Sequence, residues 1–96
     1  MIEKAAALEE LGRIRDQIER VDRALVGVIA ERVALARQVG ALKRSADLPT
    51  LDPQREAAVV RRASVLAREA GIDDEDIRYV FWQLIGMSRR AQVDEG

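Results

Sequence analysis

Two cations stand on one face of a long amphipathic segment, at a spacing that would let them act on the same anion. Ten positions from 11 to 42 step by alternating three and four residues; nine of them are aliphatic, and the exception is Arg32. Lys43 follows eleven residues later, which on an α-helix is about 16 Å along the axis but only about 20° around it. The two side chains could converge on a small anion. Alternatively, each lays its stem along the stripe and extends its charge into water.

A third cation, Arg15, can reach such an anion only from another chain. It precedes Arg32 by seventeen residues, about 25 Å along a helix and roughly 100° around it. In an antiparallel pair of chains, the partner's Arg15 would come beside Arg32, and two chains would build one site. Alternatively, Arg15 belongs to an ordinary solvated face in which arginines alternate with acidic residues.

Two neutral hydrogen-bonding groups fall within an apolar stripe near the end of the chain. Ser88 interrupts the stripe, and Gln92 follows one helical turn later on nearly the same face, about 6 Å away. Both are expected to point inward. The alternative is that Ser88 bonds to the carbonyl four residues back and that Gln92 frays with the helix end.

A charged cluster surrounds the start of another expected helix. Asp52, Arg55 and Glu56 lie within five consecutive residues. Taken alone, they are explained by an N-cap with first-turn charges. They become candidates for a site only if the fold brings them to the other polar residues.

The composition excludes several classes of chemistry. The 96 residues contain no cysteine and no histidine, which removes disulfides, thiolate chemistry and a Ser-His-Asp triad and leaves almost no basis for a zinc site. Sixteen basic and seventeen acidic residues give a net charge of −1, which argues against nucleic-acid binding. Fourteen of the basic residues are arginines, which suit bidentate carboxylate recognition, although a high genomic GC content gives the same bias.

A long helix must position the first group of candidates. The segment from Lys4 to Lys43 contains no proline and carries the aliphatic stripe, which predicts one continuous helix. Each of its glycines weakens the helix by up to about 1 kcal/mol relative to alanine. Residues 44–51 are expected to form a loop, because Pro49 and its polar neighbours interrupt the period.

Two shorter helices follow, and no segment has the pattern of a strand. Asp52 should cap the second helix and Pro53 should occupy its first position, with Gly71 just past its end. Either Asp73 or Asp74 should cap the third helix.

The inner face of the second helix is expected to contain Val59, Val60, Ala63 and either Leu66 or Ala67. That of the third helix, which should reach about Val93, is expected to contain Ile77, Phe81, Leu84, Ser88 and Ala91. The polar tail, residues 94–96, should fray.

The aliphatic stripe also predicts association. A helix of this length measures about 60 Å, whereas a compact globule of this size has a radius of gyration of about 12 Å. We therefore expect residues 1–96 to form one all-α domain whose first helix pairs with that of a second copy in an antiparallel homodimer. No apolar run approaches the roughly 20 residues of a membrane span, and the first eleven residues lack a signal-peptide pattern, so a cytoplasmic protein is expected.

These elements together resemble the all-helical chorismate mutase family, over nearly the whole chain. No single motif carries the resemblance; the order, spacing and helix lengths do. The matching elements are Ile14–Ile18 with Val21 and Asp22, Ala30–Arg32, Val39–Lys43, Asp52–Glu56, and Phe81 with Ser88 and Gln92.

The resemblance implies an intertwined homodimer, with three helices per chain, that rearranges chorismate to prephenate without a cofactor or a metal. It implies that Arg32 and the partner's Arg15 bind the substrate carboxylates, while Lys43 and Gln92 hydrogen-bond the ether oxygen. Such a site works by positioning and electrostatic stabilisation. The remaining matches are Arg55 as a further cation, Asp52 and Glu56 as contacts of the ring hydroxyl, and Ser88 as a contact of the ring carboxylate.

Three alternatives remain. Isochorismate pyruvate lyases share this fold, and Glu56, as a hydroxyl-binding carboxylate, weighs against that activity. A 4-amino-4-deoxychorismate mutase would place its ring amine between Asp52 and Glu56. Outside enzymology, the stripe alone would suit a helical dimerisation module. Some small members of the family need a partner enzyme for full activity, so a partner synthase stays among the expected alternatives.

Overall fold

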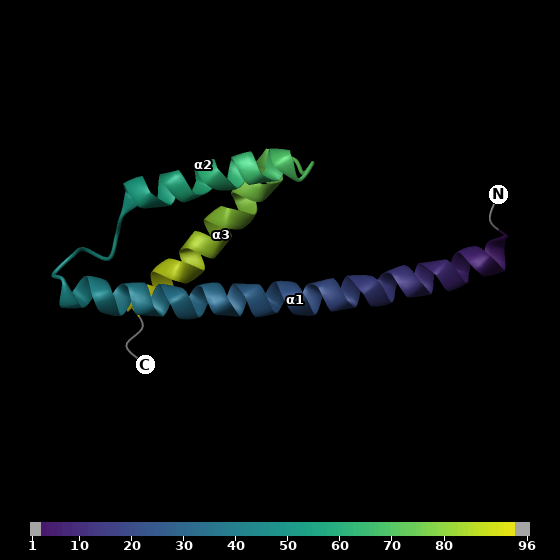
Figure 1. Cartoon of the computed structure of the whole chain (residues 1–96), viewed down its shortest axis with the longest axis horizontal. Coiled ribbons are helices and arrows are strands. Elements are labelled where there is room, and N and C mark those ends of the chain that lie inside the picture. Colours follow the sequence, from purple (N-terminus) through teal and green to yellow (C-terminus); the bar gives the residue numbers. More distant parts are fainter. Residues whose placement is uncertain (1–2, 94–96) are drawn as a thin grey trace. The chain divides into compact units, whose positions relative to one another are not determined.

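The computed structural model describes residues 3–93, all of whose regular structure is helical. Helix α1 spans Lys4–Ser45, α2 spans Pro53–Glu69 and α3 spans Asp74–Val93 (Figure 1). This confirms the predicted all-α class and the order of a long, a short and a medium helix. The chain divides into two units, residues 1–31 and 32–96, so α1 contributes to both. The tail expected to fray, residues 94–96, lies outside the described residues.

From Lys4 onward, the first unit is entirely helical. Its described residues are all exposed except Ile29, which is intermediate. The aliphatic stripe is exposed with them: Val21, for example, retains 64% of its accessible surface. The described part of this unit therefore has no hydrophobic core within the chain.

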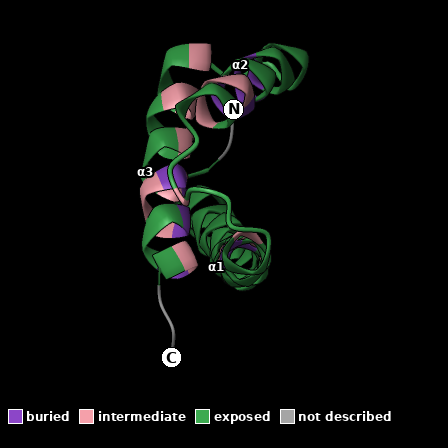
Figure 2. Cartoon of the chain, turned by 90° about the vertical axis from the view of Figure 1, so that its left-hand side faces the viewer, coloured by how far each residue is buried: buried purple, intermediate pink, exposed green. Residues whose placement is uncertain are grey.

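The second unit is built around a small core between α2 and α3. Val59 and Val60 of α2 bury their side chains with Ile85 of α3, and Phe81 packs against this cluster. Figure 2 shows buried stretches, in purple, on both α2 and α3. The predicted inner face of α2 is confirmed. Of the two residues considered for its last position, Ala67 is buried, whereas Leu66 is 53% exposed. The sequence analysis missed Ile85 because this residue directly follows Leu84, the member of the predicted α3 stripe at that turn.

The last turns of α1 are two residues longer than the sequence predicted. The helix continues through Arg44 and Ser45, so these two residues were wrongly assigned to the loop. It ends where the backbone N–H of Leu48 donates to the carbonyl of Lys43 at 2.8 Å and that of Asp47 donates to Arg44 at 3.3 Å. Asp47 adopts a left-handed conformation, with φ 55°, that reverses the chain. The two bonds satisfy the last carbonyls, so the helix needs no glycine to stop.

The boundaries of the other helices follow local capping signals. The Asp52 carboxylate accepts the backbone N–H of Arg55 at 3.0 Å, and Pro53 occupies the first helical position, as predicted. Gly71, at φ 73°, supplies the left-handed residue just past the end of α2. Of the two capping candidates for α3, Asp73 is the cap, since its carboxylate accepts the backbone N–H of Glu75 at 2.8 Å.

Ala36 and Gly40 are the buried residues of α1, and they show how α3 approaches it. A β-carbon at Gly40 would lie 2.3 Å from the backbone oxygen of Gln92 and 2.7 Å from its α-carbon. Since both are backbone atoms, only glycine allows this approach. From the sequence, Gly40 was expected only to weaken the helix. The structure shows that it also allows the close packing of α3 against α1.

Across residues 3–93, no helix combines the length and apolarity that a membrane span requires.

Candidate active site

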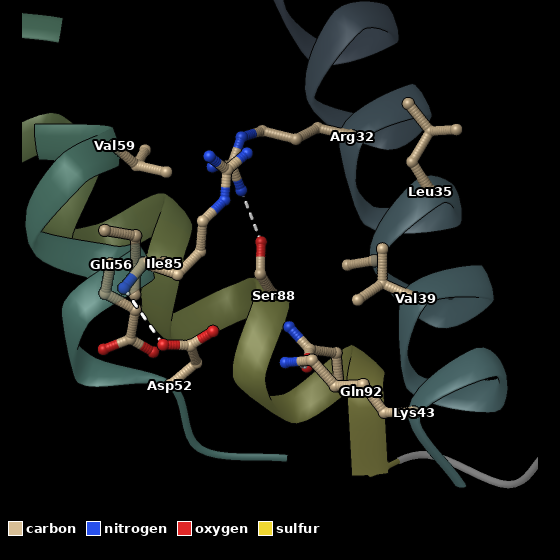
Figure 3. Close-up of a pocket in the computed structure, with 12 residues that line it drawn as sticks. Arg32, Leu35, Val39, Lys43, Asp52, Glu56, Val59, Ile85, Ser88 and Gln92 are labelled. Atoms are coloured by element: carbon tan, nitrogen blue, oxygen red, sulfur yellow. Dashed lines mark hydrogen bonds between the residues drawn. The ribbon is translucent and has the colours of Figure 1, made fainter. Parts of the chain in front are cut away.

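A cavity of about 470 Å³ lies within the second unit, a volume in the usual range for small-molecule sites. Residues of all three helices and the N-cap of α2 surround it (Figure 3). The lining residues are Arg32, Leu35, Ala36, Val39, Lys43, Asp52, Arg55, Glu56, Val59, Ile85, Ser88 and Gln92. The cavity thus combines an apolar surface from valine, leucine and isoleucine with seven polar or charged side chains.

Arg32 reaches from α1 toward α3 and donates a hydrogen bond to the hydroxyl of Ser88 (Figure 3). Partial burial lowers the pKa of Arg32, and the positive charges of Arg62 and Arg55 lower it further. Its hydrogen-bond partner is the neutral Ser88, and the ion pairs found among residues 3–93 do not involve Arg32. A partly desolvated cation among other cations would be stabilised by an anion in the cavity.

Lys43 and Gln92 form a second polar pair, between α1 and α3. The Lys43 ammonium donates to Gln92 Oε1 at 2.9 Å and to the backbone oxygen of Thr50 at 2.9 Å. An ammonium has three N–H groups, so one remains for a ligand. Because Gln92 accepts through its oxygen, its amide NH₂ also remains available as a donor. The pair therefore offers two donors side by side (Figure 3).

The backbone of Gln92 is held from α1. Arg44 donates to its carbonyl oxygen at 2.6 Å, and Gly40 permits the close approach of the same residue. The fraying predicted as an alternative for Gln92 does not occur, because two residues of α1 hold it. Arg44 had no predicted role and was expected to lie in a loop.

Two carboxylates line the α2 side of the cavity. Asp52 is the N-cap of α2, and Glu56 follows one turn later. Arg89 of α3 donates to both oxygens of Glu56, with its Nε 2.7 Å from Oε2. This hydrogen bond is the main cause that lowers the pKa of Glu56, and Lys43 lowers it as well, whereas burial and the charge of Asp52 oppose the shift. The negative charge of Glu56 is therefore compensated by Arg89.

The arrangement suits binding and electrostatic stabilisation of an anion. Three cations, Arg32, Lys43 and Arg55, face two carboxylates, and Arg89 compensates one of those from outside the lining. The excess of positive charge favours a ligand with more than one negative charge. Within residues 3–93, no three acidic side chains gather into a group that could hold a metal ion.

Seven of the eight predicted site residues line this one cavity: Arg32, Lys43, Asp52, Arg55, Glu56, Ser88 and Gln92. The snorkelling alternative for Arg32 and Lys43 is wrong in this chain, since both donate hydrogen bonds to groups across the fold. Arg15 belongs to the first unit, is exposed and does not line the cavity.

Sequence reasoning missed Arg89. Its partner Glu56 lies 33 residues away on a different helix, so the pairing depends on how α2 and α3 are registered against each other. No local pattern encodes that register. The one available signal was the position of Arg89 directly after Ser88, a residue already predicted to point inward.

Comparison with known proteins identifies the family. The family model for chorismate mutase type II matches residues 14–93. The chain is 32% identical to the chorismate mutase of Methanocaldococcus jannaschii over 85 residues, which cover 88% of this chain and 86% of that protein. It is 33% identical to the T-protein of Enterobacter agglomerans over 87 residues, 91% of this chain but only 23% of that protein.

A relative with a different named activity also matches. The chain is 30% identical over 88 residues to the 4-amino-4-deoxychorismate mutase of Streptomyces pristinaespiralis, with 92% of this chain and 68% of that protein covered. The chain therefore spans less than a quarter of the T-protein and most of the other two relatives. Since the family model covers well over half of its length, the chain belongs to the chorismate mutase type II family.

Proposed function

We propose that the protein converts chorismate to prephenate by an intramolecular [3,3] rearrangement. The observation that carries this proposal is the hydrogen-bonded pair of Lys43 and Gln92, which faces the same cavity as Arg32. Within one substrate molecule the ether carbon–oxygen bond breaks as a carbon–carbon bond forms, and no proton is gained or lost. A protein nucleophile or proton shuttle is therefore unnecessary, in keeping with a cavity lined by arginine, lysine and amide groups.

The donors of Lys43 and Gln92 fit the charge that develops during this reaction. As the carbon–oxygen bond breaks, negative charge grows on the ether oxygen, and two fixed donors directed at it stabilise the transition state more than the substrate. The Lys43 ammonium supplies one donor and the neutral amide of Gln92 the other. The bond between them fixes which end of the amide faces the ligand.

The cations of the cavity fit the two carboxylates of the substrate. Arg32 lies partly buried, with neutral Ser88 as its partner, and a ring carboxylate placed there would accept hydrogen bonds from both side chains. Arg55 lines the cavity as a further cation. Asp52 and Glu56 are the acceptors available to the ring hydroxyl. Binding of both carboxylates would hold the substrate in the folded conformation from which the new bond forms.

We further propose that residues 1–96 act as one chorismate mutase domain in an antiparallel homodimer, in which the partner's Arg15 completes each cavity. Two features support this. The exposed stripe of α1 offers an association surface, and the cavity lining does not include Arg15, which the family resemblance assigns to the partner's side of the site. We also propose a cytoplasmic location.

Mixed dimers test this shared site directly. An Arg15→Ala chain keeps Arg32, and an Arg32→Ala chain keeps Arg15, so a mixed dimer would contain one intact site and one doubly altered site. Two inactive variants that exchange subunits freely should therefore regain about a quarter of the wild-type activity. If the mixture stays inactive although mass spectrometry detects mixed dimers, the shared site is wrong.

The first experiment is to follow the loss of chorismate absorbance with purified protein near neutral pH, without added metal or cofactor, and to identify the product. Protein-dependent formation of prephenate supports the proposal. Formation of pyruvate from isochorismate, with no turnover of chorismate, would instead identify the lyase alternative. If the protein converts neither substrate, alone or with a partner synthase added, the helical dimerisation module becomes the preferred interpretation.

The second candidate function, rearrangement of 4-amino-4-deoxychorismate, is favoured by the similarity to the 4-amino-4-deoxychorismate mutase of Streptomyces pristinaespiralis. The same assay with the amino substrate separates the two activities. We propose chorismate as the preferred substrate because of the charge state of the Glu56 subsite.

A further inference from the structure

The carboxylate of Glu56 is engaged by one arginine through both of its oxygens. Arg89 donates from Nε to Oε2 at 2.7 Å and from a terminal nitrogen to Oε1. The two side chains differ in environment, since Glu56 is 14% exposed and Arg89 is 49% exposed. Arg89 thus lies at the edge of the site and does not line the cavity, whereas Glu56 does.

This geometry compensates the charge of Glu56 without consuming its capacity to accept hydrogen bonds. Each carboxylate oxygen has two lone pairs, and Arg89 occupies one on each. A neutral hydroxyl can still donate to either oxygen. A ligand ammonium would form the same hydrogen bond, but it would also experience the positive charge of Arg89 a few ångströms behind the carboxylate.

The neighbouring carboxylate is compensated in a different way. Asp52 accepts the backbone N–H of Arg55 at the N-terminus of α2, where the aligned peptide dipoles add partial positive charge. Neither acidic residue of this subsite is therefore an uncompensated anion. The subsite offers acceptors for a hydroxyl and little net attraction for a cation.

We propose that Arg89 is a specificity-determining positioning residue, which makes the cavity select a neutral hydroxyl over an ammonium group at the ring position facing Glu56. The inference rests on the proposed function, because it concerns the ring substituent of that substrate. It predicts that discrimination between chorismate and 4-amino-4-deoxychorismate depends on a residue outside the cavity lining. Arg89 acts through Glu56 and does not itself contact the substrate.

The test is the ratio of kcat/KM for chorismate to kcat/KM for 4-amino-4-deoxychorismate, measured for wild type and for Arg89→Met. Removing the compensating charge should lower this ratio by about twofold to fivefold, the range that a partly exposed ion pair can support. Arg89→Lys keeps the charge and should retain most of the selectivity. Arg90→Met removes the same charge from the next, exposed position of α3 and is the matched control.

Two further measurements separate selectivity from a structural effect. In a Glu56→Gln background, Arg89 loses the carboxylate that holds its charge at the edge of the cavity, so Arg89→Met should change the ratio less than it does in the wild-type background. The wild-type preference should also shrink as the pH rises above the pKa of the substrate amine, because the amine is then neutral while arginine stays charged. A misplaced α3 would produce neither pattern.

The outcomes distinguish the inference from the proposed function. If wild type converts chorismate but Arg89→Met leaves the ratio unchanged, the inference is overturned and the function stands. A ratio that falls equally in Arg90→Met would also overturn it. If wild type converts neither substrate, the proposed function fails and the inference fails with it.

Discussion

The two parts of α1 carry the same aliphatic period but have different surroundings. In the first unit, the described residues are exposed, and the stripe has no cover within the chain. In the second unit, the buried residues of α1 are Ala36 and Gly40, and the exposed fraction of Ala36 is 7%. Intramolecular packing of α1 therefore uses a face of small residues, whereas the large aliphatic residues of the first unit stay exposed.

This difference assigns separate tasks to the two parts. The second part of α1 supplies Arg32 and Lys43 to a cavity whose other residues come from the same unit. In the proposed dimer, the first part contributes the association surface and Arg15. Substitutions in the second part should therefore affect chemistry directly, and those in the first part should act through association.

The largest expected effect is on turnover, in the Arg32→Ala variant. The loss of a fixed donor from a substrate carboxylate should lower kcat/KM for chorismate by about a thousandfold. The fold should persist, because burial and neighbouring cations already disfavour the Arg32 charge in the ligand-free protein. Thermal unfolding and steady-state kinetics measure the two quantities.

Arg23→Ala, which removes a charge from an exposed position of the first part, is the matched control and should leave kcat/KM within about twofold. Wild-type turnover in a well-folded Arg32→Ala protein would contradict the assignment of the cavity as the active site.

The next effect is on association, in the Val21→Asp variant. In the proposed dimer, the aliphatic stripe of α1 is buried, and a carboxylate in its middle would have no partner. The dimer should therefore dissociate at micromolar concentration. Turnover should be lost as well if the partner's Arg15 is required. Sedimentation equilibrium gives the mass of the species in solution. Arg23→Asp introduces the same side chain two positions away, on the opposite face of the helix, and should stay dimeric. An unchanged mass for Val21→Asp would place the interface elsewhere.

Local signals made much of the fold predictable. Asp52 and Gly71 mark the ends of α2 through capping rules that involve only neighbouring residues, and both predictions are confirmed. The end of α1 was wrong by two residues because Asp47 adopts a left-handed conformation that glycine or asparagine would have signalled more clearly.

Relations between helices were harder to predict. Hydrophobic period marks Leu66 and Ala67 equally well, and only the packing of α2 against α3 separates them. Most of the cavity lining was anticipated through the family resemblance, which encodes the three-dimensional arrangement indirectly. Arg89 and Gly40 escaped because the first depends on the register of two helices and the second on a close approach of backbones.

A pair of glycine substitutions compares the two parts of α1 with the same chemical change. Gly40→Ala would place a β-carbon against the backbone of Gln92, so the last turn of α3 must move. We expect a loss of about 1 to 3 kcal/mol in unfolding free energy. We also expect kcat to fall about tenfold with little change in KM, since Gln92 acts mainly in the transition state.

Gly12→Ala meets no atom within 4 Å and should stabilise the helix by up to about 1 kcal/mol. Denaturant unfolding and kinetics of both variants check the comparison. Equal changes in unfolding free energy at the two positions would contradict the packing role of Gly40. Destabilisation by Gly12→Ala would indicate that a second chain packs against that position.

The smallest expected effect is a pH dependence of stability within the second unit. Hydrogen bonding to Arg89 holds the pKa of Glu56 below its ordinary value of 4.5. Because the pKa is lower in the folded state than in the unfolded state, the pair stabilises the fold above the unfolded pKa, and this contribution is lost as the pH falls through the folded pKa. Wild type should therefore exceed Arg89→Met in Tm by at most a few degrees at neutral pH, since solvent screens the exposed arginine.

The difference in Tm should decline below pH 4.5 and vanish once Glu56 is protonated in both states. A difference that persists in strong acid would mean that Arg89 stabilises α3 through packing of its stem, and its influence on the charge of Glu56 would then have to be judged from substrate selectivity alone.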